Sequence, residues 1–425
     1  MTMTIIIIIC VLLLIGYLFD LSSARTKIPS VILLLILGWG VREITSFFSI
    51  TVPDLSGLLP ILGTLGLILI VLEGALELEI NRSKFKLIKK SFFSSFGTII
   101  LLSFVISYAF HYYGDVPMRQ ALINAIPISV ISSSVAISSS KNLSLTNKEF
   151  IVYESSLSDI VGVIFFNFAI ENDIVTGQSF IHFGAQVLII CVVSFIATLV
   201  LSFLLRKIDH PIKHAPIIIL LILIYAVSEV FHLPALIFIL FFGLFLSNID
   251  GMKNLTWINK LNPYKFKKEV STFSEIVMEG AFLIRTFFFT LFGYSFETKE
   301  ILNESTFNSA LLIFGAIVIV RGIILLIARI PLFPLLFVAP RGLVTILLFF
   351  GIPASMAFPL VNKSLVIQVI VLTALFMMIG LMVTGKKRSE DKAKGKQSAI
   401  EEIDVSAPSD DESNMRHLPL NETGE

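Results

Sequence analysis

Long apolar blocks recur along almost the whole chain, and this pattern constrains the fold more than any other feature. Blocks of about 17 to 25 residues follow one another up to residue 384, and each is long enough for an α-helix that crosses a bilayer. Hydrophobic residues make up 56% of the 425 residues and charged residues only 15%. The sequence therefore predicts an all-α polytopic membrane protein.

We predict about thirteen transmembrane helices within a transmembrane domain at 1–384. The first block lacks the basic start and the small-residue cleavage site of a signal peptide, so we expect a retained helix. The short eighth and ninth spans meet near Pro234, where a single bent segment is the alternative. The predicted spans are 3–20, 28–46, 57–79, 90–112, 120–140, 149–170, 180–205, 215–230, 233–249, 273–295, 306–328, 332–351 and 364–384.

Lys and Arg are distributed unequally between alternate loops. With the N-terminus outside, the inner loops hold eighteen of them and the outer loops four. Because basic loops stay on the cytoplasmic side, this predicts an outside N-terminus and a cytoplasmic C-terminus. Residues 385–425 are polar and charged, so we expect a disordered cytoplasmic tail whose basic start suits anionic lipid.

Ionisable residues inside the spans carry the main functional signal, because a charge in hydrocarbon is costly. Arginines cannot lose their charge and need anionic partners; those in spans are Arg285, Arg321 and Arg341. The acids outnumber them, and are Glu73, Glu77, Glu154, Asp159, Glu229 and Glu279. This surplus is what a cation pathway requires. The alternative is that most of these groups form ion pairs that hold helices together.

The sixth span combines acids with hydroxyls. Glu154 and Ser158 share one helix stripe, and Ser155 and Asp159 share the adjacent one. Ser155 and Asp159 thus offer two hard oxygen ligands to a transported metal cation such as Na⁺, Li⁺ or K⁺. The carboxylate can equally take a proton. A group that binds either a cation or a proton is the minimum device for exchange.

Two predicted spans look broken. In the fifth, Pro127 precedes three serines at 132–134, whose hydroxyls can satisfy backbone groups freed by unwinding. In the twelfth, the Pro-Arg-Gly sequence at 340–342 interrupts the helix. Interrupted spans in corresponding halves are typical of transporters with a midplane site. We therefore expect an inverted-repeat fold in which two broken helices cross near Asp159 and a basic side chain.

Five segments match motifs of one transporter family. They are LIVLEGALEL at 69–78, SSSVAI at 132–137, YESSLSDIVGVIFF at 153–166, YAVSEVFHLPALIFILFFGLFLSN at 225–248 and APRGLVTILL at 339–348. Together, and in this order, they resemble the monovalent cation:proton antiporter superfamily, and in particular its NhaP-like sodium/proton exchangers. The thirteen-helix count fits that resemblance.

The resemblance implies a role for each matched residue. The ion- and proton-binding site would be Asp159 with Ser155, Ser158, Glu73, Ser132 and Ser133. Structural ion pairs and the helix crossing would use Glu154, Arg321, Arg341, Arg285 and Glu229; Glu154 would pair with an arginine, for which Arg321 is the favoured candidate and the others stay open. The resemblance further implies alternating access by an elevator-like motion, a homodimer that meets through its first spans, and a prokaryotic plasma membrane. The only ligands would be the transported ions, with no cofactor.

The chain departs from the family pattern at two places. The family's Asn or Asp before the essential aspartate is Ser158, and its Asp and Pro in the unwound fifth helix are Ser133 and Ser134. Ser158 carries no titrating charge, so we expect electroneutral 1:1 exchange of Na⁺ for H⁺. A titrating Glu73 or a coupled Arg285 would change that ratio. Li⁺ and K⁺ remain alternatives, because hydroxyl-rich sites bind all three ions.

Two other functional classes fit less well. A channel lined by the acids would conduct without proton coupling, and broken helices are less typical of it. An intramembrane enzyme needs a nucleophile–His–acid set, but the six histidines fall at span edges, in loops or in the tail. Cys10 and Cys191 imply neither a disulfide framework nor a metal site, and no phosphate loop or nucleic-acid patch is present. The sequence predicts a transporter and not an enzyme.

Overall fold

The computed structural model of the protein is helical, with no β-strand among the residues it describes. Those residues are 2–26, 28–50, 55, 57–78, 80, 84–140, 143–174, 176–207, 210, 213–231, 233–248, 263–301 and 303–405. Side chains are described for all of these except 2, 4, 5, 24, 25, 206, 207, 263–266, 301 and 385–405. The chain divides into two compact units, Met1–Gly380 and Leu381–Glu425, and the first carries the fold and the site.

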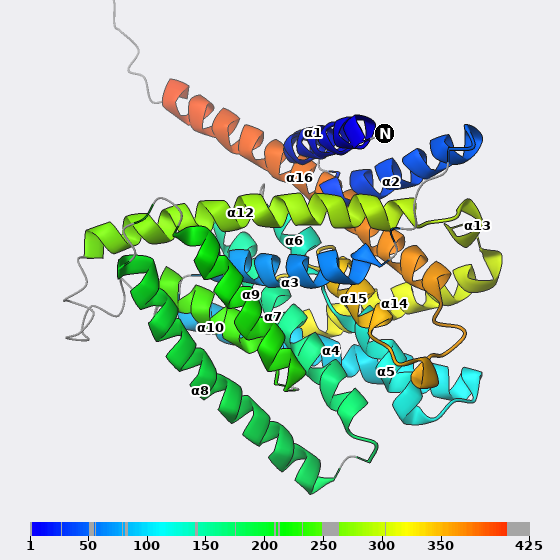
Figure 1. The fold of residues 1–425 in the computed structure, drawn as a ribbon. Helices are drawn as coiled ribbons and strands as arrows, with labels where there is room; N and C mark the ends of the chain where they lie inside the picture. The colour runs from blue at the N-terminus through cyan, green and yellow to red at the C-terminus, as the bar shows by residue number, and fades with distance from the viewer. Residues whose placement is uncertain are drawn as a thin grey trace, which may run out of the picture. The chain divides into compact units, whose positions relative to one another are not determined.

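The helices follow the predicted spans in order (Figure 1). They are α1 Thr2–Thr26, α2 Ser30–Phe47, α3 Leu58–Glu77, α4 Phe85–Gly114, α5 Met118–Ser129, α6 Ser133–Ser139, α7 Leu145–Glu171, α8 Gly177–Lys207, α9 His214–Val230, α10 Leu236–Ser247, α12 Pro263–Tyr294, α13 Thr298–Ile301, α14 Glu304–Ile327, α15 Leu343–Phe350 and α16 Lys363–Val405. Within the described residues, nine helical segments are long and apolar enough to cross a membrane, and α9 and α10 are shorter apolar helices. The exact total of thirteen spans stays a prediction.

Local sequence signals set several helix ends. The Ser144 hydroxyl caps α7 by accepting a hydrogen bond from the Asn147 amide (3.4 Å). The Asn303 side chain caps α14 by accepting one from the Ser305 amide (3.1 Å). Pro234 lies between α9 and α10 and has no amide hydrogen to donate. The eighth and ninth predicted spans are therefore separate helices.

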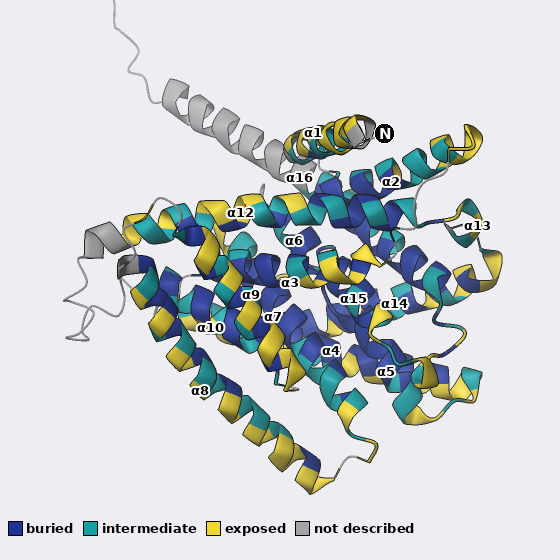
Figure 2. Cartoon of the chain, viewed as in Figure 1, coloured by how far each residue is buried: buried dark blue, intermediate teal, exposed yellow. Residues whose placement is uncertain are grey.

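The helices of the first unit pack in two groups. In the scaffold group, α12 packs against α2 and α3, and α10 packs against α3 and α8. In the site group, α4 packs against α5, α7 and α14, and α15 packs against α5. Contacts of α3 with α15, α7 and α6 join the two groups. Figure 2 shows buried residues concentrated in the middle helices, whereas α1 and α8 carry many exposed residues.

Helices α2 and α12 approach each other through glycines. A Cβ atom on Gly38 would lie 2.0 Å from the Thr290 carbonyl oxygen, and one on Gly293 would lie 2.3 Å from the Leu35 carbonyl oxygen. Neither position can carry a side chain unless the backbones separate. Small residues at such contacts are typical of close helix pairs in membranes.

Both predicted breaks are present, but they differ in form. The fifth span consists of α5 and α6 with residues 130–132 extended between them. The twelfth span is helical only in its second half, as α15, whereas residues 333–337 form turns. Pro331 and Pro334 explain this difference, because proline removes helical hydrogen bonds and clashes with the preceding turn.

The last helix runs past the end of the thirteenth predicted span. Helix α16 continues to Val405, 21 residues beyond residue 384. The side chains from 385 on, and all of residues 406–425, lie outside the described part of the chain. The backbone of 385–405 is thus helical where a disordered tail was predicted, whereas the disorder of 406–425 and the lipid contact stay predictions.

Candidate ion-binding site

The extended parts of the two broken spans are hydrogen-bonded to each other. The backbone N–H of Ser132 donates to the carbonyl oxygen of Pro340 (2.9 Å). Gly342 lies against the same segment, and a Cβ atom there would come within 2.7 Å of the Ser132 Oγ. Only glycine allows the two segments to come so close. The crossing expected from the interrupted sequences is therefore a direct backbone contact.

Asp159 lies at this crossing, in the middle of α7, with only 1% of its surface exposed. Its Oδ2 accepts hydrogen bonds from the Ser133 hydroxyl and from the Ser133 backbone N–H (3.4 Å). Its Oδ1 is buried and has no hydrogen-bond partner among the described residues. Buried polar atoms normally have a partner, so an unpartnered carboxylate oxygen can take a proton or a cation.

The serines predicted around Asp159 have distinct roles in the geometry. The Ser158 hydroxyl accepts a hydrogen bond from the Ile131 backbone N–H (2.9 Å), so it satisfies the extended segment. The Ser155 hydroxyl donates to the Ile151 carbonyl oxygen one turn earlier (2.7 Å). The Ser132 hydroxyl is bonded to that of Ser134 (2.9 Å). Of the predicted serines, Ser133 alone forms a hydrogen bond with Asp159 within the described residues.

Arg341 is fully buried, and its guanidinium binds the free carbonyl groups at the C-terminal end of α5. Its Nε donates to the Ile128 carbonyl oxygen (2.8 Å) and its Nη2 to that of Ser129 (3.4 Å). Its Nη1 donates to the Ala339 carbonyl oxygen (2.6 Å). A helix C-terminus carries unsatisfied carbonyls and partial negative charge, and a cation there is stabilising. The basic side chain predicted at the crossing thus serves the broken backbone.

Glu154 and Arg321 form a buried bidentate ion pair, as expected from the sequence. The Nη1–Oε1 and Nη2–Oε2 distances are 3.1 and 2.9 Å, and each residue is 1% exposed. The Ser94 hydroxyl donates to Glu154 (2.6 Å), and the Arg321 Nε donates to the Leu335 carbonyl oxygen (2.9 Å). The pair therefore connects α4, α7 and α14 with the turns before α15 and is not available to an ion.

Glu73 and Arg285 line a cavity of about 70 Å³ that also reaches Ser133 at the crossing. Both are half-buried, and Glu73 takes part in further interactions. Glu229 is exposed near the end of α9, a helix that packs against α8 and α10. The predicted set is therefore divided: Asp159 and Ser133 are joined directly, and Glu73 reaches them through the cavity.

Several residues of this region were not among the predicted site residues. Ser94 supports Glu154, and the Thr373 hydroxyl accepts a hydrogen bond from the Arg341 backbone N–H (3.1 Å). Isolated hydroxyls in apolar helices give no signal that separates them from ordinary helix residues. Glu77 and Lys148 also line the cavity. The sequence indicates Glu77 as an acid inside a predicted span, whereas Lys148 falls in a predicted loop and gives no such signal.

The side chains of the described residues offer no typical ligand group for a resident metal ion. No group of three or more His, Cys, Asp and Glu side chains comes together among the described residues. Asp159 and its hydroxyl neighbours instead provide hard oxygen atoms.

Solved structures with this fold include the sodium proton antiporter MjNhaP1 from Methanocaldococcus jannaschii at pH 8. The two chains are 17% identical, with a TM-score of 0.65, over 89% of this chain and 99% of that one. An electron-microscopy structure of the same antiporter gives 18% identity and a TM-score of 0.65, over 90% and 95% of the two chains. At these identities the likeness shows the fold alone. The search of curated proteins found no match.

The sequence itself identifies the family. The family model described as "Sodium/hydrogen exchanger, transmembrane" matches residues 9–385, which is most of the chain. This confirms the resemblance drawn from the five motifs. Members of this family are membrane transporters that need no cofactor, and the ions are their substrates. The chain therefore belongs to the transmembrane sodium/hydrogen exchanger family and is a multi-pass cation/proton exchanger.

Proposed function

We propose that the protein exchanges Na⁺ for H⁺ with 1:1 stoichiometry by alternating access around Asp159. One observation carries this proposal: Asp159 is buried at the crossing with Oδ2 bound by Ser133 and Oδ1 unpartnered among the described residues. A negative charge at that depth is costly. Either a proton or a monovalent cation removes the cost, so the two ions compete for one group.

The electroneutral ratio is supported by the state of the neighbouring groups. Ser158 has no charge to exchange, and its hydroxyl is bonded to the Ile131 N–H. Glu154 is neutralised by Arg321. Glu73 shares its cavity with Arg285. Asp159 is then the exchanging carboxylate. The other oxygen ligands for the cation would come from Ser133, Ser132, Ser155 and Glu73.

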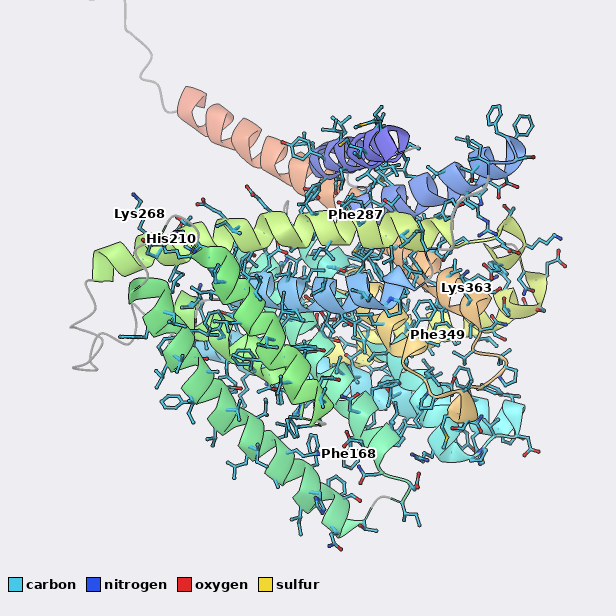
Figure 3. The ribbon with its side chains drawn as sticks, in the orientation of Figure 1. Phe168, His210, Lys268, Phe287, Phe349 and Lys363 are labelled. Carbon is cyan, nitrogen blue, oxygen red and sulfur yellow. The ribbon has the colours of Figure 1, made fainter. Side chains whose placement is uncertain are left out.

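We also propose the N-terminus-outside topology and a homodimeric plasma-membrane protein of prokaryotic type, following the family resemblance. Figure 3 shows Lys268 and His210 at one end of the fold and Lys363 at the other. Lys84, Lys148 and Lys213 belong to loops or helix ends that this topology assigns to the cytoplasm. The many exposed apolar residues of α1 suit contact with lipid or a second copy.

The test is cation-dependent proton flux in proteoliposomes, with Na⁺, Li⁺ and K⁺ compared with and without an imposed membrane potential. We expect flux with Na⁺ that is insensitive to the potential. Asp159→Asn should abolish it. Asp173→Asn makes the same chemical change at a carboxylate with 88% exposure and should leave flux intact. Flux that persists in Asp159→Asn would refute the site, and a preference for K⁺ would change the assigned ion.

A further inference from the structure

Two cavities lie in succession between the crossing and the ends of α3, α4 and α7. The inner cavity, of about 70 Å³, reaches Ser133, the partner of Asp159. The outer cavity, of about 330 Å³, is lined by Lys84, Glu149 and other residues at those helix ends. Glu77 and Lys148 line both cavities. These two side chains, one from each helix group, therefore lie where the two cavities meet. We call this place the junction, and a cation on its way to Asp159 would pass it.

The two lysines of the outer cavity differ in their electrostatic state. The Nζ of Lys84 lies 3.0 Å from Glu149 Oε1, so its charge is neutralised locally. Lys148 is half-buried in the first turn of α7 and forms no ion pair with any residue in the described part of the chain. Its ammonium therefore presents a positive charge to the junction. Glu77 presents a negative one from the other side.

We propose that Lys148 is an affinity-determining residue of the cation entrance. A cation that passes the junction is repelled by Lys148 and attracted by Glu77, and both interactions weaken when salt screens them. The balance of the two charges sets the KM for the cation on this side of the membrane. The inference rests on the proposed exchange at Asp159, because the junction matters only if that carboxylate is the destination.

The test uses the full-length protein in proteoliposomes, with proton flux measured against Na⁺ concentration at low and high ionic strength. Lys148→Gln should lower the KM about threefold with the maximum rate within twofold, and the difference should shrink at high ionic strength. Lys148→Ala should act like Lys148→Gln, and Lys148→Arg should resemble the wild type. Glu77→Gln should raise the KM about threefold, and Lys148→Gln/Glu77→Gln should return near the wild-type value.

Lys84→Gln/Glu149→Gln is the matched control, because it removes both charges of the ion pair and leaves the net charge of the outer cavity unchanged. Its KM should stay near the wild-type value. An unchanged KM in both Lys148→Gln and Lys148→Ala, with active wild type, would overturn the inference and leave the proposed function standing. Equal shifts in Lys84→Gln/Glu149→Gln and Lys148→Gln would also overturn it. Absence of cation-dependent flux in the wild type would instead refute the proposed function.

Discussion

Removing Arg321 should destabilise the protein strongly without touching the ion-binding carboxylate. In Arg321→Met, Glu154 loses two charge-assisted hydrogen bonds, of 2.9 and 3.1 Å, and keeps only the Ser94 hydroxyl. The Leu335 carbonyl oxygen loses its donor at 2.9 Å. Breaking one side of a buried pair costs about 3–5 kcal/mol, of which a single orphaned polar group accounts for about 1–3 kcal/mol. We expect Arg321→Met to lower the free energy of unfolding by about 3–5 kcal/mol.

The measurement is reversible denaturant unfolding in detergent micelles, followed by loss of helical circular dichroism. Glu154→Gln should also destabilise, because it leaves the guanidinium charge buried without its counter-charge. Glu154→Gln/Arg321→Met removes both charges together, so its cost should fall below the sum of the single costs by about 2 kcal/mol. As control, Asp173→Asn breaks an exposed pair with Arg119 and should cost at most about 1 kcal/mol. Additive single costs, or a cost below about 1 kcal/mol for Arg321→Met, would refute this reasoning.

Other predictions address the crossing. Gly342→Ala should lower both the unfolding temperature and the cation-dependent flux, because its Cβ would come within 2.7 Å of a neighbouring side-chain oxygen. Gly315→Ala is the control, because its Cβ meets nothing within 4 Å, and both properties should stay near the wild-type values. Ser158→Ala should cost about 1–3 kcal/mol in the same unfolding assay, since it orphans the buried Ile131 N–H, and Ser158→Asn should recover part of that loss. Ser158→Asp adds a second carboxylate and should make flux respond to an imposed potential; unchanged insensitivity would contradict the carboxylate count. Arg341→Lys should lower stability and flux, because one ammonium cannot reproduce the fork of donors to three carbonyls.

Much of the fold follows from the sequence because each span must satisfy its backbone internally in lipid. That requirement makes apolar length informative and makes prolines and serines visible as breaks. That a buried arginine must find an acid was also accessible, but the choice of Arg321 as the partner of Glu154 came from the family resemblance. The turns at 333–337 were not predicted as such, although the closely spaced prolines gave a signal for them.

The site was less predictable because its contacts depend on where segments cross. Nothing near Arg341 in the sequence indicates that its Nε reaches a carbonyl at Ile128, 213 residues away. Ser158 was expected at the ion, but its hydroxyl accepts a hydrogen bond from the extended segment instead. Ser155 donates to the preceding turn, a local bond that helix serines commonly form. Helix spacing places these serines on a face but does not decide which acceptor each one meets.

The glycine contact between α2 and α12 limits how any transport motion can occur. With backbone atoms in contact at Gly38 and at Gly293, these two helices cannot slide past each other by a turn without colliding. We therefore expect α2 and α12 to move together as one rigid unit. Relative movement must fall instead on contacts made by flexible side chains, such as the leucine contact at Gly63, where α3 meets α15. In the proposed alternating access, these two residues without side chains would thus limit which surfaces of the exchanger can move.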